Sequence, residues 1–423
     1  MDKKLVLRDK FSKIYRHLSK QEITLILGAR RVGKTTLLYQ LKEKLLENKV
    51  LEKNIYFLNL DLVDDLMLLK SQSEFIDYIK ERISSSKIYF FIDEVQRLEN
   101  PGLFLKGIYD LNLPVKFILT GSSSLEIRAK TQESLAGRKR IFYLYPFSFR
   151  EYLRVQNSFL VPRLLKEKLN KIDQNEINKY LSEFLIFGGY PEVVLLNSRQ
   201  EKIKTLEEIF NSYIEKDIVG FFKIEDRVSF TKLVTILASQ VGNLLNNNEI
   251  SGTLGIKSET VKRYLQALEN TFVINTIRPF YKNVRKELTK MPKVFFLDNG
   301  LRNFALKRFK KFNDCQDQGQ ILENYVFSFL KKTLETYQEI YFWRTKDRAE
   351  VDFIIEHEEL MAIEVKASKL KKPIFGRSLG NFIRSYHPKK AFLINLAYQG
   401  RKTISQTKIN FGQAWEMYRF LHG

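Results

Sequence analysis

Residues 23–36 read ITLILGARRVGKTT, and the fold of the N-terminal part of the chain follows from this stretch. The apolar run at 23–27 has the length and composition of a buried strand, and an amphipathic segment with helical spacing continues from residue 34. Gly28 to Thr35, between the two, match the phosphate-binding pattern G-x-x-x-x-G-K-[ST]. Glycines let backbone N–H groups curl around phosphate oxygens, and the helix N-terminus adds its positive dipole end. The stretch therefore predicts a strand, a phosphate-binding turn and a helix.

This turn predicts a site for ATP and Mg²⁺. We expect Lys34 to contact the outer phosphates and act in catalysis, and Thr35 to coordinate the Mg²⁺. An ordinary strand-to-helix turn is the alternative, and the strand and helix on either side of the pattern make it the weaker one. The expected nucleotide-binding residues are Gly28, Ala29, Arg30, Arg31, Val32, Gly33, Lys34, Thr35 and Thr36.

Two further strand ends complete the predicted site. The segment IYFFIDE ends a hydrophobic strand with Asp93, which can hold Mg²⁺ through water, and Glu94, a catalytic residue that can polarise the attacking water. In the segment FILTGSSS, Ser122 follows a strand and is expected close to the γ-phosphate, where it could sense the nucleotide. A serine cluster after a strand is just as often plain turn chemistry.

The segment SLAGRKR offers an arginine to the same chemistry. Arg138 or Arg140 could serve a neighbouring subunit as an arginine finger, because phosphoryl transfer develops charge that a guanidinium group stabilises. We assign this catalytic role to Arg138, and it implies a homo-oligomer. A basic surface loop is an equally good interpretation.

Several segments carry a family resemblance. They occur in the order GARRVGKTTLL, FFIDEVQRL, LTGSSS, SLAGR, PFSFREYL, FGGYPEV and YIEKDIV. Together they resemble the bacterial and archaeal AAA-type P-loop ATPases that carry a C-terminal domain of nuclease-like fold, and the resemblance spans nearly the whole chain. It implies an ATPase core, a helical and winged-helix middle, and a restriction-endonuclease-like end.

The periodicity of the chain agrees with an α/β fold. Strand and helix patterns alternate from about residue 22 to 146, which specifies a parallel sheet covered by helices. The pattern then becomes helical, and the last part mixes a helix with strands. Combined with the resemblance, the expected parts are an AAA-type P-loop ATPase domain at 1–155, a helical region at 156–227, a winged-helix or helix-turn-helix part at 228–285, a linker at 286–312 and a nuclease-like α/β domain at 313–423.

Residues 249–274 have the spacing of a helix-turn-helix, with a turn at Gly255 and residues 272–280 as a possible wing. The second helix is expected to be apolar on one side. Its other side would offer DNA or its phosphates the residues Lys257, Lys262, Arg263 and Gln266. Helix-turn-helix units also serve as mere packing modules inside ATPases, so both interpretations stay open.

A second cluster of charged residues lies near the C-terminus. Glu364 and Lys366 share one face of a predicted strand, because side chains alternate along it, and Asp352 lies in the strand-like segment before it. These catalytic candidates could bind one or two Mg²⁺ ions while Lys366 orients or activates a water for phosphodiester attack. Glu323, on the preceding amphipathic helix, could complete the metal shell together with Asp352 and Glu364.

This order resembles the D…E-x-K nuclease superfamily, including its Holliday-junction resolvase branch. The motif is short, since charged and apolar residues alternate on any half-exposed strand. Nuclease-like folds can also bind DNA without cutting it.

Composition supports a polyanionic partner. The 423 residues include 71 Lys and Arg against 49 Asp and Glu, a net charge of +22. Twelve Lys and Arg against one acid, Glu416, give the final 58 residues a net charge of +11, which favours a surface that follows phosphates. The single Cys315 excludes an intramolecular disulfide. No uncharged apolar run reaches the length of a membrane span and no export signal is evident, so we expect a cytoplasmic protein without a membrane partner.

The sequence as a whole predicts an ATP-hydrolysing, DNA-associated protein that acts on branched or other DNA structures through a nuclease-like C-terminal domain. One alternative is a nucleotide-controlled binding or regulatory switch without nuclease activity. Another is an ATPase that acts on protein partners.

Overall fold

The computed structural model describes residues 6–83, 87–122, 135–166, 169–212, 218–222, 224–281, 290–356 and 359–422. By its internal contacts the chain divides into two compact units. The first unit comprises Met1–Pro146 with Asn270–Phe272, and the second unit comprises Phe147–Glu269 with Val273–Gly423. Each unit is described by itself.

The first unit is built on a five-stranded sheet whose paired strands are all parallel, in the order β2-β3-β4-β1-β5. The strands are β1 (Ile23–Leu27), β2 (Ile55–Asn59), β3 (Ile88–Asp93), β4 (Val115–Gly121) and β5 (Lys139–Tyr143). All residues of β1 and β4 are buried, which explains their near-continuous apolar runs, because a central parallel strand is covered on both faces. The predicted α/β fold is confirmed.

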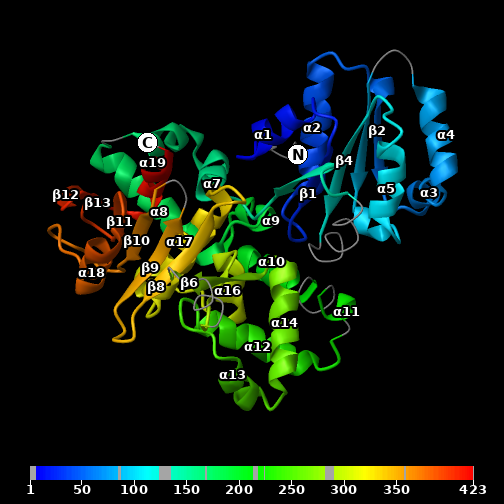
Figure 1. The fold of residues 1–423 in the computed structure, drawn as a ribbon. Coiled ribbons are helices and arrows are strands. Elements are labelled where there is room, and N and C mark those ends of the chain that lie inside the picture. The colour runs from blue at the N-terminus through cyan, green and yellow to red at the C-terminus, as the bar shows by residue number, and fades with distance from the viewer. Residues whose placement is uncertain are drawn as a thin grey trace. The chain divides into compact units, whose positions relative to one another are not determined.

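Helices cover both faces of this sheet. They are α1 (Phe11–His17), α2 (Lys34–Glu47), α3 (Val63–Leu68), α4 (Gln72–Arg82) and α5 (Pro101–Tyr109), with short 3₁₀ turns at Glu52–Asn54 and Val95–Arg97. Figure 1 shows α1 and α2 on one side of the sheet and α3, α4 and α5 on the other. This follows from right-handed crossovers, since the connection from β1 to β2 runs across the sheet in the opposite direction to the later ones.

The second unit surrounds an eight-stranded mixed sheet in the order β12-β13-β11-β10-β9-β8-β6-β7. Its strands are β6 (Ile274–Pro279), β7 (Lys293–Phe296), β8 (Glu339–Arg344), β9 (Glu350–Glu356), β10 (Met361–Val365), β11 (Lys390–Ile394), β12 (Gly400–Ile404) and β13 (Thr407–Gly412). Its helices are α7 (Phe149–Gln156), α8 (Lys171–Phe187), α9 (Pro191–Val194), α10 (Arg199–Phe210), α11 (Val219–Phe221), α12 (Arg227–Ser239), α13 (Asn247–Leu254), α14 (Ser258–Asn270), α16 (Asn299–Ala305), α17 (Gln318–Thr333), α18 (Arg377–Tyr386) and α19 (Met417–His422). Shorter 3₁₀ helices span Ser158–Leu165, Phe312–Asp314 and Ala414–Glu416.

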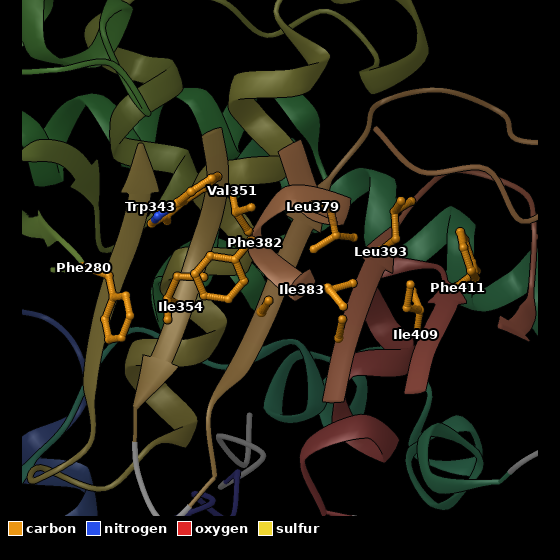
Figure 2. Packing of buried hydrophobic residues seen from close by; sticks show 12 residues of the cluster. Phe280, Trp343, Val351, Ile354, Leu379, Phe382, Ile383, Leu393, Ile409 and Phe411 are labelled. Atoms are coloured by element: carbon orange, nitrogen blue, oxygen red, sulfur yellow. The ribbon is translucent and has the colours of Figure 1, made fainter. Parts of the chain in front are cut away.

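One hydrophobic cluster joins α18 to this sheet. Phe382 of α18 stacks edge-on against Trp343 of β8 and Phe280, with ring centroids 5.4 and 6.3 Å apart. Figure 2 shows the cluster running from Phe280 across the sheet to Phe411. Burial of this apolar surface holds the strands that carry the charged C-terminal residues in a fixed register.

The helix-turn-helix expected at 249–274 forms as α13 and α14. Gly255 joins them with a left-handed φ of +67°, and Val261, Tyr264 and Leu268 of α14 are buried. Its expected polar residues, Lys257, Lys262, Arg263 and Gln266, are exposed. The segment expected to form a wing is instead β6, which pairs with β7 and β8 in the large sheet.

The described residues of the segment expected as a linker at 286–312, which are 290–312, form a strand and a helix of the second unit. β7 is an edge strand of the sheet and α16 is buried in the second unit. Arg302 of α16 is fully buried, ion-pairs with Asp317 at 2.7 Å and donates to the carbonyl oxygen of Ala238 at 3.0 Å. A strand and a helix this short carry too few periods to be distinguished from a loop by hydrophobic pattern.

Candidate functional site

The predicted P-loop follows β1, and two glycines fix its path. Gly33 precedes α2 with a left-handed φ of +89°, a conformation that glycine adopts without a Cβ penalty. A Cβ on Gly28 would lie 2.1 Å from the carbonyl oxygen of Leu144. The Gly28 N–H donates to the carbonyl of Gly121 at the end of β4. The loop therefore begins in close contact with two neighbouring backbone segments.

Lys34 is the first residue of α2 and is almost wholly buried. Its Nζ donates to the carbonyl oxygens of Gly28 at 3.2 Å and Ala29 at 3.0 Å. Burial lowers the pKa of Lys34, although the charges of Glu94 and Asp93 act in the opposite direction. A buried ammonium held by carbonyl oxygens is suited to bind a phosphate, whose charge would compensate its desolvation.

Two hydroxyl groups converge on Asp93. Thr35 Oγ1 donates to Asp93 Oδ2 at 2.5 Å, and Thr120 Oγ1 donates to Asp93 Oδ1. Asp93 itself is buried at the end of β3. A hydroxyl and a carboxylate side by side at the start of the helix are oxygen ligands of the kind that Mg²⁺ accepts when phosphates and water supply the rest. The residues present therefore fit the ion that Thr35 and Asp93 were predicted to hold.

Glu94 follows Asp93 in a left-handed conformation with φ +58°. Its N–H donates to Thr120 Oγ1 at 3.1 Å, and its Oε2 accepts from Gln96 Nε2, which also bonds Ser122 Oγ at 2.9 Å. A non-glycine residue held in this region is strained, and such strain is commonly kept at functional positions. The structure thus joins Glu94 to Ser122 through Gln96. Sequence reasoning missed Gln96, although an amide close behind the two acids was a signal for it.

Arg138 lies away from the P-loop of its own unit. Its carbonyl accepts from the N–H of Ile23, the first residue of β1, whereas the P-loop follows the last residue of that strand. The guanidinium forms an ion pair with Asp110 at 2.7 Å. Arg138 therefore lies at the opposite end of the strands from the P-loop, and the predicted arginine finger would need the P-loop of another subunit.

A second contact of the P-loop was also missed. Arg8 is buried, and its guanidinium donates to the carbonyl oxygens of Val32 at 2.7 Å and Tyr145 at 2.5 Å. One fork-shaped side chain thus ties the loop to the segment after β5. An arginine in a charged N-terminal stretch gives no signal of this role, because both acceptors are main-chain atoms.

In the second unit, the predicted charged residues meet on neighbouring strands. Ile363 of β10 pairs with Phe353 of β9, which brings Asp352 and Glu364 next to each other. Asp352 Oδ2 accepts from the N–H of Val365 at 2.7 Å, and Lys366 Nζ lies 2.7 Å from Glu364 Oε1. Glu364 is buried, whereas the Lys366 side chain is 48% exposed. Lys366 can therefore reach a ligand from solvent.

Glu323 of α17 joins these residues, and so does a lysine that was not predicted. Lys293 Nζ lies 3.7 Å from Glu323 Oε1 and 2.5 Å from Glu350 Oε1. Burial raises the pKa of Glu323 to about 8, with Asp352 adding to the effect and Lys293 opposing it. Burial likewise raises the pKa of Asp352 to about 6. We call Lys293, Glu323, Glu350, Asp352, Glu364 and Lys366 the acidic centre.

The acidic centre does not fit the predicted Mg²⁺. Among the residues that the structure describes, no group of three or more His, Cys, Asp or Glu side chains is arranged to hold a metal ion. The prediction that Glu323, Asp352 and Glu364 form a metal shell is thus not met in this arrangement. Lys293 also places an ammonium 3.7 Å from Glu323 Oε1, beside carboxyl groups that were expected to hold the ion.

Models of known families match three successive parts of the chain. The family described as "AAA domain" matches residues 20–153. Two families described as domains of unknown function, DUF8612 and DUF4143, match residues 178–311 and 318–413. The description of the C-terminal match includes no activity, so the nuclease-like fold stays a prediction. Over the described part of the chain, no helix is both long and apolar enough to cross a membrane.

Relatives occur in bacteria and archaea. An uncharacterized protein of Haemophilus influenzae is 30% identical over 72% of this chain and 73% of its own length. An uncharacterized protein of Methanocaldococcus jannaschii is 28% identical over 83% of this chain and 76% of its own. Among solved structures, a Walker-type ATPase of Pyrococcus abyssi aligns with a TM-score of 0.47 at 16% identity, over 72% of this chain and 97% of that one.

The AAA-domain match contains the P-loop, Asp93 and Glu94, the residues that the geometry brings together for nucleotide chemistry. The Haemophilus protein is related over most of both lengths, so this chain belongs to that protein's family, and the AAA-domain match makes the N-terminal part of this chain a P-loop ATPase domain.

Proposed function

We propose that this ATPase couples ATP hydrolysis to DNA binding. Lys34 would hold the outer phosphates, Thr35 and Asp93 would hold the Mg²⁺, and Glu94 would orient the attacking water. The observation that carries the assignment of ATP hydrolysis is the cluster of Thr35, Asp93 and Thr120. It lies beside the buried Lys34, whose ammonium is suited to bind a phosphate. The Mg²⁺ would neutralise charge on the phosphates.

The proposed DNA contact uses the exposed side of α14. Lys257, Lys262 and Arg263 are exposed there, while the opposite side of the helix is buried. Lys262 is paired only loosely with Glu259 at 3.7 Å, and both side chains are largely exposed. A basic helix face of this kind can bind phosphates or enter a groove. The net charge of +22 supports the same partner.

The arginine finger also remains a proposal. Because Arg138 lies at the opposite end of the strands from the P-loop of its own unit, its catalytic role requires a homo-oligomer in which it enters a neighbour's site. Ser122, linked to Glu94 through Gln96, would report the state of the γ-phosphate in the same assembly.

The test is DNA-stimulated ATP hydrolysis. The wild-type rate should rise with DNA at low salt and fall steeply with salt, because Lys and Arg contacts to phosphates release counterions. Lys34→Ala should abolish hydrolysis, and the matched control Lys53→Ala, an exposed lysine of the same unit, should not. Replacing both Lys262 and Arg263 by Glu should remove the stimulation and leave the basal rate unchanged. Stimulation that survives this reversal would exclude α14 as the DNA contact.

A second candidate function is hydrolysis of phosphodiester bonds in branched or linear DNA. It is favoured by the placement of Asp352 and Glu364 on adjacent strands with a half-exposed Lys366 beside them. Forked, junction and linear DNA should then be cut by the wild type and spared by Asp352→Ala and Lys366→Ala. Equal cleavage by all three proteins would disprove this site. No cleavage by any of them would leave the ATP-controlled DNA-binding switch.

A further inference from the structure

A buried lysine occupies the acidic centre of the second unit. The Lys293 side chain is 1% exposed, and its stem starts from edge strand β7. Its Nζ approaches Glu350 at 2.5 Å and Glu323 at 3.7 Å, and lies 5.2 Å from the centre of the Phe342 ring. A buried ammonium is stable only when anions compensate its desolvation. The Glu350 carboxylate, the Glu323 carboxyl group and an aromatic face provide that compensation.

Two more cations pair with carboxylates of the acidic centre. Glu350 is also bound by Arg344, with 2.8 Å between Nη1 and Oε2, and Glu364 is bound by Lys366. The four carboxyl groups of the acidic centre thus face three cationic side chains. A divalent ion among the same carboxylates would repel Lys293 at close range, because like charges interact strongly where water is excluded. The protein has already supplied the cation that such a cluster requires.

We propose that Lys293 is the resident cation of the acidic centre and that its ammonium keeps divalent metal ions away from Glu323 and Asp352. The acidic centre is then preformed and free of metal beside the exposed Lys366. Metal-dependent cleavage of DNA requires the Lys293 ammonium to move away from these carboxyl groups. This assignment concerns the second unit alone and does not rest on ATP hydrolysis. Its failure would leave the proposed ATPase function untouched.

Two carboxylate oxygens indicate what would happen without the lysine. Glu323 Oε1 and Glu364 Oε2 are buried and have no hydrogen-bond partner among the described atoms. The backbone of Gly242 packs closely against Glu323, since an added Cβ there would lie 2.5 Å from Glu323 Oε2. Removing the ammonium would therefore leave carboxylate oxygens that are already held in the interior. Oxygen ligands of this kind suit Mn²⁺ and Mg²⁺.

The experiment measures Mn²⁺ binding by calorimetry and by the EPR signal of free Mn²⁺. Every protein is the full chain with Thr35→Ala, without nucleotide, so that the P-loop does not contribute. The parent chain should show no Mn²⁺ site that depends on Asp352. Lys293→Met should gain one site, at least about tenfold tighter than any background binding, because a full positive charge has been removed. Adding Asp352→Asn to that variant should abolish the gain.

Matched variants separate charge from packing. Lys293→Arg keeps the charge and should gain no site. Lys202→Met removes another buried lysine of the same unit, which pairs with Glu183 at 3.0 Å, and should also gain none. If Lys293→Met does not fold, the double variant Lys293→Met with Glu350→Gln removes the lysine and one of its anions together, which preserves the charge balance.

Two results would overturn the proposal. One is Mn²⁺ binding by the parent chain that Asp352→Asn abolishes, since a metal would then coexist with Lys293. The other is a folded Lys293 variant without the ammonium that still gains no Mn²⁺ site. A gain that appears with Met and not with Arg, and disappears with Asp352→Asn, supports it.

Discussion

The sharpest prediction concerns Arg8, which holds the P-loop from outside the motif. In Arg8→Met the apolar stem is kept, and the two hydrogen bonds to Val32 and Tyr145 are lost. Hydrogen bonds from a charged donor are each worth about 1.5–3 kcal/mol. Both carbonyl oxygens are acceptors for a buried guanidinium. We therefore expect the first unit to lose about 3 kcal/mol of its free energy of unfolding.

That loss corresponds to a Tm lower by roughly 6–12 °C, at about 2–4 °C per kcal/mol for a unit of this size. The chain provides its own reporters for the two units. Both tryptophans, Trp343 and Trp415, lie in the second unit. Their fluorescence follows the unfolding of that unit, and far-UV circular dichroism follows both. The unfolding of the first unit is detected by circular dichroism and not by tryptophan fluorescence. Only this transition should move to lower temperature.

The matched control is Arg16→Met. Arg16 is exposed and its side chain donates to the carbonyl of Ser12 within the same helix, so its loss should cost well under about 1 kcal/mol. Saturating Mg-ATP should reduce the difference in Tm between Arg8→Met and the wild type if the loop still binds the nucleotide. Equal stability of the Arg8 and Arg16 variants would show that the two Arg8 hydrogen bonds do not stabilise the first unit. An equal shift of the tryptophan transition in Arg8→Met would show that the effect is not confined to that unit.

Three further predictions follow from single buried groups. Gly28→Ala should weaken Mg-ATP binding at least about tenfold in a fluorescent-nucleotide titration, because its Cβ would lie 2.1 Å from the Leu144 carbonyl oxygen; Gly319→Ala, in open space, should not. Burial lowers the pKa of Lys116 to about 7, so the unfolded chain binds more protons above that pH and stability should rise from pH 7 toward 10.5. Lys116→Met should remove that slope, on the order of 3 kcal/mol at most, in urea titrations at pH 7 and 9.5. Arg302→Met should destabilise the second unit by up to about 3–5 kcal/mol, seen in tryptophan fluorescence, because it leaves the Asp317 carboxylate with the exposed Arg308, 3.4 Å away, in place of its buried partner; an unchanged transition would contradict its place in the core.

The nucleotide site could be predicted because its parts are local. Gly28 to Thr35 occupy one turn between a strand and a helix, so the pattern of residue types specifies the geometry directly. Asp93 meets Thr35 of the P-loop for a related reason. The carboxyl ends of parallel strands meet at one edge of a sheet, so an acid at the end of β3 must approach the P-loop after β1.

The acidic centre was predicted in part. Alternation along β10 correctly put Glu364 and Lys366 together, and the expected neighbour Asp352 lies beside them. Lys293 could not be predicted, since it belongs to a segment that reads as a linker and its partner Glu350 is 57 residues further on. Hydrophobic periodicity relates residues that are close in the sequence, so it cannot pair two residues on different strands 57 positions apart.

The P-loop, the parallel sheet around it and helices α13 and α14 follow from local sequence, because each depends on residues close together in the chain. Three features could be seen only after folding: Arg8 holds the loop, Arg138 lies at the opposite end of the strands from the P-loop, and Lys293 lies in the acidic centre. These depend on which backbone carbonyls and carboxylates come within hydrogen-bonding distance after packing. Burial then makes each pairing obligatory, because a charge removed from water must find its partner inside the protein.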